Sequence, residues 1–127
     1  MSYHFSKTVK EDFDSAIDKV TEELKKEGFG VLTQIDIATT LKNKLDVDMP
    51  KYKILGACNP EFAYKALTAE KEIGTMLPCN VIVRETENGI VVSAVDPIAS
   101  MISIKNESLG KIAGQVADKL KRVINNL

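Results

Sequence analysis

Aromatic residues and excess charge are scarce in this sequence. It has no Trp, only three Tyr and four Phe, and its 17 basic and 18 acidic residues leave a net charge of −1. Proteins that bind single-stranded nucleic acid stack bases on aromatic rings, and most nucleic-acid-binding proteins carry a positive surface field. Both features are weak here, so we expect no nucleic-acid partner.

Long apolar runs are also missing. No segment approaches the roughly 20 apolar residues that cross a bilayer, and residues 1–7 lack the basic start and apolar run of a secretory signal. We therefore expect no membrane association and a cytoplasmic location. In that compartment the two cysteines should be free thiols, because the redox buffer of the cytosol reduces most disulfides.

Metal-ligand and phosphate-binding motifs are absent as well. The single His4 and the two cysteines at 58 and 79 are too far apart in sequence to resemble the paired ligands of a zinc site. Residues Gly28-Phe29-Gly30 do not match a P-loop or a dinucleotide fingerprint. We predict neither a metal nor a cofactor.

What the chain does contain is the composition of one folded domain. Its 127 residues are 44% hydrophobic and 28% charged, and both values are ordinary for a globular protein. Single cores commonly form from 100 to 150 residues. We predict one domain over residues 1–127.

Five segments carry helical signals. The clearest follows Thr8, which we predict to be the N-cap in a capping box with Glu11, and it ends at Gly28. Its apolar residues recur every three or four positions, at Phe13, Ile17, Val20 and Leu24. Further helices are predicted after Asp36, after Asn59-Pro60, after Asp96-Pro97 and over residues 107–124.

Strand signals separate these helices. Residues 3–7 alternate aromatic and polar side chains, Phe29 opens an extended segment, and residues 52–57, 80–85 and 90–95 are rich in strand-forming residues. Asn88-Gly89 predicts a hairpin in which both turn residues have positive φ. The order β-α-β-α-β-α-β-β-α therefore predicts an α+β fold, with an antiparallel or mixed sheet of four to five strands covered by helices on one face.

The two cysteines lie at predicted strand ends. Cys58 ends one strand immediately before the Asn59-Pro60 helix start, and Cys79 follows Pro78 at the start of the next strand. If those strands are antiparallel, the two ends are neighbours; a disulfide would further need Cα atoms within about 7 Å. A thiol beside a helix start has a lowered pKa and is nucleophilic, whereas a buried cysteine is ordinary core.

The cysteine segments also carry a family resemblance. The sequence resembles the domain-of-unknown-function family 302 over nearly its whole length, through Leu55-Gly56-Ala57-Cys58-Asn59-Pro60, Leu77-Pro78-Cys79-Asn80-Val81, Gly28-Phe29-Gly30-Val31, Lys42 and Asp96-Pro97. The resemblance implies a curved antiparallel sheet backed by helices, similar to the TATA-binding-protein architecture, and a homodimer. It implies no established activity.

Three hypotheses for function follow. The first is a non-catalytic domain, a homodimer, that binds a small molecule or a protein at Cys58, Asn59, Pro60, Pro78 and Cys79, because irregular backbone at strand–helix boundaries often builds sites. The second is a thiol-dependent enzyme or redox protein that uses Cys58, with Cys79 as the resolving thiol. The third is a structural homodimerisation module. Whether the protein is an enzyme stays open at this point.

Overall fold

The structure, a computed structural model, describes residues 2–127. Its elements follow the predicted order with one addition, a 3₁₀ helix before the fourth strand. They are β1 (His4–Val9), α1 (Phe13–Lys26), β2 (Gly30–Asp36), α2 (Ile37–Leu45), β3 (Tyr52–Cys58), α3 (Pro60–Ala69), the 3₁₀ helix η1 (Lys71–Met76), β4 (Cys79–Thr86), β5 (Gly89–Val95), α4 (Pro97–Ser100) and α5 (Glu107–Asn125).

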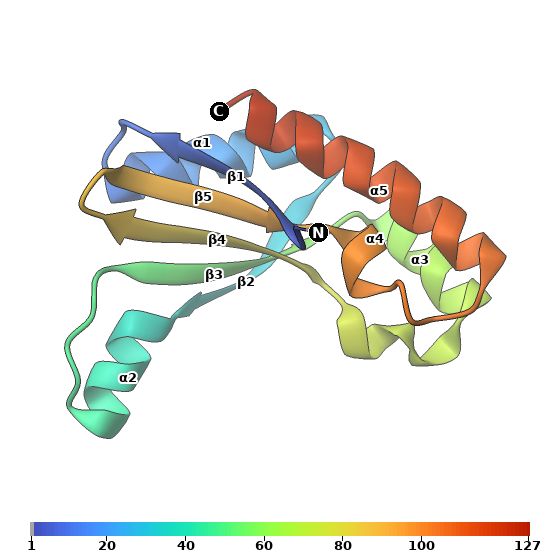
Figure 1. Cartoon of the computed structure of the whole chain (residues 1–127), viewed down its shortest axis with the longest axis horizontal. Helices are drawn as coiled ribbons and strands as arrows, with labels where there is room; N and C mark the ends of the chain where they lie inside the picture. The colour runs from blue at the N-terminus through green and yellow to red at the C-terminus, as the bar shows by residue number, and fades with distance from the viewer. Residues whose placement is uncertain (1) are drawn as a thin grey trace.

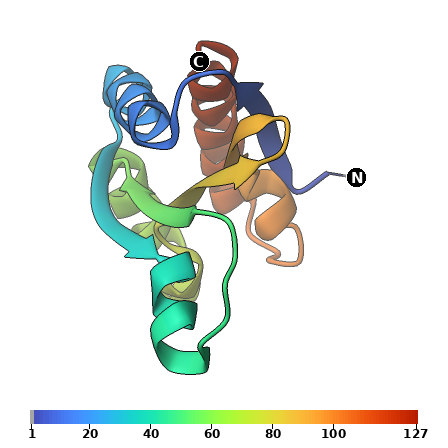
Figure 2. The same ribbon diagram turned by 90° about the vertical axis from the view of Figure 1, so that its left-hand side faces the viewer.

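The five strands form a single sheet in the order β1-β5-β4-β3-β2, and every neighbouring pair is antiparallel. This confirms the predicted α+β class and resolves the choice between an antiparallel and a mixed sheet. The sheet is open, so β1 and β2 are its two edges. Its curvature is visible in both views (Figures 1 and 2).

Helices α1 and α5 lie side by side on one face of the sheet, as predicted (Figure 2). The apolar face of α1 is buried as its spacing predicts, with Leu24 and Val20 fully buried. Alternate residues of the central strands, such as Leu55, Val83 and Val92, meet the two helices from below. This packing is the main core of the domain.

The start of α1 differs from the prediction. Thr8 belongs to β1 and does not cap the helix; Asp12 is the N-cap, and its Oδ1 accepts a hydrogen bond from the Ser15 amide at 2.8 Å. Thr8 pairs with Val91 in the sheet, so β1 continues past the predicted boundary. The competing aspartate is a better cap, because its carboxylate also interacts with the positive end of the helix dipole.

The end of α1 is as predicted. Gly28 has φ of +87°, and its amide donates to the Lys25 carbonyl, while the Phe29 amide donates to the Leu24 carbonyl. Such hydrogen bonds satisfy the last carbonyls of the helix and require a residue that tolerates left-handed backbone.

The hairpin between β4 and β5 is confirmed, but its turn is different. Glu87 and Asn88 connect the strands, and Thr86 pairs with Gly89. Of the turn residues only Gly89 has positive φ, at +129°, so Asn88 does not adopt the conformation we predicted for it. A Cβ at Gly89 would lie 2.9 Å from the Val9 carbonyl oxygen, which explains why glycine takes this position.

The alternation in β1 was also misjudged in part. Tyr3 precedes the strand and is 70% exposed, whereas Phe5 packs against the main core. Lys7 lies on the same side as Phe5, and its ammonium donates to the main-chain oxygens of Leu127 at 2.6 Å and Asn125 at 3.3 Å. Lys7 thereby ties the edge strand to the end of α5.

A second group of helices lies beyond one end of the sheet. Helices α3, η1 and α4 pack around the first half of α5, at the right of Figure 1. A small separate core holds them together, formed by Ala66, Ile73 and Leu109. The 3₁₀ helix was not predicted, because residues 71–76 contain a glycine and only a few apolar side chains and so lack a helical pattern.

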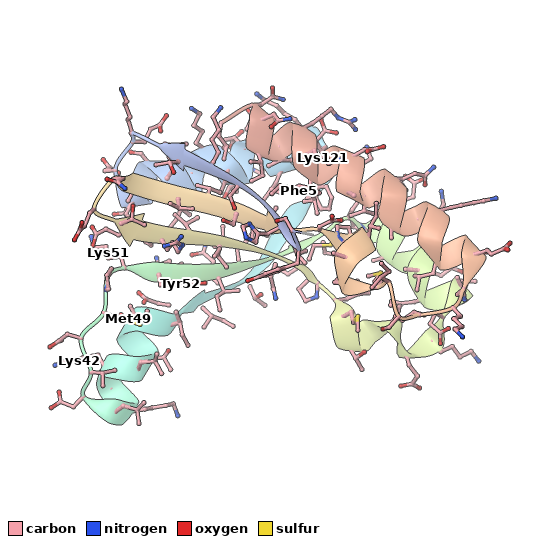
Figure 3. The ribbon with its side chains drawn as sticks, viewed as in Figure 1. Phe5, Lys42, Met49, Lys51, Tyr52 and Lys121 are labelled. Atoms are coloured by element: carbon pink, nitrogen blue, oxygen red, sulfur yellow. The ribbon has the colours of Figure 1, made fainter. Side chains whose placement is uncertain are left out.

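Helix α2 projects away from the rest of the domain (Figures 1 and 2). Asp36 caps it as predicted, but none of its residues is buried, and Leu45 is 66% exposed. The segment 46–51, which returns to β3, is equally exposed, and Figure 3 labels Met49 and Lys51 on it, between Lys42 on α2 and Tyr52 at the start of β3.

We predict that Lys7→Met lowers the free energy of unfolding by about 1 kcal/mol, because two hydrogen bonds to main-chain oxygens are lost while the aliphatic stem is kept. Urea unfolding followed by circular dichroism measures this. Lys10→Met, at an exposed position beside the same strand, is the control and should leave stability unchanged. Equal stability of both variants would contradict the role given to Lys7.

Candidate ligand-binding cavity

An apolar cavity lies where the sheet meets the second group of helices. Its volume is about 290 Å³, and it is partly open to solvent. We call it the thiol cavity, because both cysteines line it. Its lining comes from the ends of β3 and β4, from α3, α4 and α5, and from the segments beside them: Phe29, Leu32, Ala57, Cys58, Asn59, Phe62, Ala63, Ala66, Leu67, Leu77, Pro78, Cys79, Pro97, Met101, Leu109, Ile112, Ala113 and Val116.

The sheet brings the two cysteines together. In the antiparallel pair of β3 and β4, Ala57 lies opposite Cys79, so Cys58 is one residue further along. By the spacing of such ladders, the Cα atoms of Cys58 and Cys79 are about 6 Å apart. Both are free thiols. The two cysteine segments are therefore neighbours.

The Cys79 thiol is held in its neutral form. Burial raises its pKa to about 11, and the nearby Cys58 contributes in the same direction. A thiolate there would lose its hydration and gain no positive partner in exchange. Cys79 is consequently a poor nucleophile at neutral pH.

The side chain of Asn59 forms a tertiary hydrogen bond and does not cap the helix that it precedes. Asn59 is the N-cap residue of α3, but its side chain makes no capping hydrogen bond. Instead its Nδ2 donates to the Glu27 carbonyl at 3.2 Å, across to the end of α1. Gly28 makes room for this contact, because a Cβ there would lie 3.0 Å from the same Nδ2. Sequence reasoning identified the helix start but not this tertiary bond.

The two prolines have different surroundings. Pro78 lines the thiol cavity and also lies above Gly56, where a Cβ would approach Pro78 Cγ to 2.8 Å. Pro60 is exposed as the first residue of α3 and does not line the cavity. Four of the five predicted site residues thus surround one cavity, and Pro60 lies beside it.

The cavity also explains an unexpected exposure pattern in α3. Phe62, Ala63, Ala66 and Leu67 recur at the spacing of one apolar helix face, yet Ala66 is the one buried residue of α3. Leu67 is 40% exposed. These side chains face the cavity, so they have no protein atoms on that side. The helical spacing of apolar residues identifies an apolar face of α3, but it does not show whether other side chains pack against that face or whether it lines a cavity.

Charged side chains surround the Phe62 ring. The ammonium groups of Lys65 and Lys119 lie 5.4 and 5.8 Å from its centroid. Glu27 is nearby, and its Oε1 accepts hydrogen bonds from Arg122 Nε at 3.1 Å and Nη2 at 3.0 Å. The sequence could not predict these contacts, because the residues that form them come from α3, from α5 and from the end of α1.

Within residues 2–127, no group of three or more His, Cys, Asp and Glu side chains is arranged to hold a metal ion. In the same residues, no helix combines the length and apolar character needed to cross a bilayer.

The sequence profile described as "Domain of unknown function DUF302" matches residues 5–127. This chain belongs to the DUF302 family. A solved structure agrees: the crystal structure of an uncharacterized conserved DUF302 protein from Bacillus stearothermophilus superimposes with a TM-score of 0.92 at 26% sequence identity, covering 98% of each chain. No curated protein matches the sequence. The predicted family and fold are thus confirmed, and the family itself has no known function.

We predict that Cys79 of this DUF302 protein is alkylated slowly. With a pKa of about 11, only about 0.1% of the thiol is ionised at pH 8, against roughly a quarter of a free cysteine. In Cys58→Ser, the iodoacetamide rate should be at least about 100-fold below that of the urea-unfolded variant and should rise up to about pH 11. A rate equal to that of the unfolded chain would contradict this assignment.

Proposed function

We propose that this DUF302 protein binds a small, largely apolar molecule in the thiol cavity and is not a catalyst. The observation that supports this proposal is that 18 residues, from the sheet, from helices α3, α4 and α5 and from the segments beside them, line one apolar cavity that is partly open to solvent. Apolar cavities with a few polar groups at one end are the usual form of small-molecule sites.

The dimensions favour a compact ligand. At about 290 Å³, the cavity has about twice the 150 Å³ that accepts benzene in an engineered protein core. We therefore expect ligands of about ten carbon atoms. The amide of Asn59 and the two thiols are the polar groups of the lining, so most of the ligand should be hydrocarbon.

The alternative of a thiol-dependent enzyme or redox protein has one supporting feature, the adjacency of Cys58 and Cys79. The raised pKa of Cys79 weighs against its role as the resolving thiol, since resolution of a mixed disulfide requires a thiolate. We therefore propose that the thiols act as apolar lining in a reducing, cytoplasmic setting.

We predict that the neutral probe 1-aminoanthracene binds to the protein with a fluorescence increase and that decan-1-ol displaces it with a Kd of about 10 µM. Ala63→Phe should weaken both interactions at least about tenfold, because the ring would occupy the cavity that Ala63 lines.

The control for this measurement is Thr68→Phe, which adds the same ring to an exposed position of α3 outside the cavity. It should bind like the unmodified protein. If decan-1-ol fails to displace the probe, or if Ala63→Phe binds normally while folded, the proposed site is wrong.

We also propose that the protein is a homodimer that associates through the β2 edge. The seven residues of β2 contain neither Lys nor Pro, the residues that usually protect an edge strand from pairing. Ile35 on β2 is 47% exposed, and the following α2 arm exposes Leu45. Two antiparallel β2 edges related by a two-fold axis would pair with each other and cover this apolar surface.

Sedimentation equilibrium tests the association. We predict a dimer at micromolar concentration for the unmodified chain and a monomer for Ile35→Lys, because the charge would be buried in the strand pair. Tyr64→Lys alters an exposed aromatic residue on α3 and should leave the dimer intact. A monomeric unmodified protein at 100 µM would rule out the homodimer.

A further inference from the structure

We propose that the ligand of the thiol cavity is an aliphatic carboxylate whose negative group binds at Lys119 and Lys65 beside Phe62. This inference rests on the proposed function and names the class of ligand. It follows from how the two ammonium groups are placed relative to the cavity and how little they are engaged by protein acceptors.

The ammonium group of Lys119 donates no hydrogen bond to a protein acceptor within residues 2–127. In residues 2–127, the carboxylate within 4 Å of its ammonium is that of Glu27, at 3.9 Å, which is beyond hydrogen-bond distance. The same Glu27 oxygen already accepts two hydrogen bonds from Arg122. The Lys119 side chain is 27% exposed, and its ammonium is open to water, since no buried side-chain nitrogen in residues 2–127 lacks a hydrogen-bond partner. An arriving anion would replace that water as the acceptor.

Lys65 adds a second positive group at the same ring. Its ammonium lies 5.4 Å from the Phe62 centroid, and its carboxylate contact, with Glu61 at 3.5 Å, is an exposed pair within one helix. Pairs of this kind contribute little and exchange readily. Lys65 is therefore free to turn toward a stronger anionic partner.

Phe62 connects these charges to the cavity. It lines the thiol cavity and is at the same time the ring over which both ammonium groups lie. A ligand whose alkyl chain fills the cavity and whose head lies beside Phe62 would bury its hydrocarbon and place its carboxylate within reach of two cations. Charge-assisted hydrogen bonds formed there would be partly shielded from water and hence stronger than at an open surface.

A comparison of decanoate with decan-1-ol at pH 7.5 and low ionic strength, by displacement of 1-aminoanthracene, tests the inference. The two ligands share a chain length and differ in charge. We expect decanoate to bind about tenfold more tightly, and this advantage should shrink to about threefold or less in 0.5 M NaCl because salt screens the partly exposed ammonium groups.

Lys119→Met keeps the aliphatic stem over Phe62 and removes the charge. It should reduce the decanoate advantage from about tenfold to about threefold or less, because only Lys65 then remains, and it should leave decan-1-ol unchanged, whereas Lys119→Arg should retain the full advantage. Lys121→Met is the matched control: Lys121 is also on α5 and also lies over an aromatic ring, but that ring is Phe5 on β1, which does not line the cavity (Figure 3).

The outcomes separate the two proposals. Equal affinity for decanoate and decan-1-ol would overturn the carboxylate and leave the apolar site standing. A decanoate advantage that stays at about tenfold in Lys119→Met, or that disappears in Lys121→Met, would overturn the assignment to Lys119. Failure of both ligands to displace the probe would overturn the site itself together with the carboxylate.

Discussion

The antiparallel pairing of β3 with β4 is the constraint on which the candidate site depends. Because Ala57 lies opposite Cys79, the last residue of one strand and the first of the next meet at the same end of the sheet. The chain leaves that end as α3 and reaches it again through η1, so these helices must enclose the space beyond the strands. A parallel pair would have separated the two cysteines by the length of a strand.

Local sequence patterns predict most of the helices and strands of this fold. The elements and their order are defined by the spacing of apolar residues in α1 and α5, by the caps at Asp36 and Asp96, and by the glycines after α1 and at the start of β5. The start of α1 was predicted wrongly because the sequence offers two competing N-caps four residues apart. One is Thr8 with Glu11, and the other, which the structure uses, is Asp12 with Ser15. The turn at Glu87-Asn88 was misjudged because both candidate turns contain Asn88, and only the strand register distinguishes them.

The site was predictable in part. Cys58, Asn59, Pro78 and Cys79 could be placed at strand ends from sequence, and antiparallel pairing then makes them neighbours. The cavity could not be predicted, because an apolar side of α3 looks the same whether it meets protein or empty space. The positions of Lys119 and Arg122 near Phe62 and Glu27 also depend on how α5 crosses α1 and α3, which no local pattern encodes.

The hydrogen bond from Asn59 to the Glu27 carbonyl joins the turn after α1 to the start of α3. Its two ends are 32 residues apart in sequence, and two residues that line the thiol cavity, Phe29 and Asn59, lie at or beside them. The length of that turn is therefore fixed by two tasks at once, because it ends a helix and also holds two parts of the cavity lining together. An insertion between Glu27 and Gly30 would leave each element intact but would separate those two parts, so relatives with a larger cavity should differ first in this short turn.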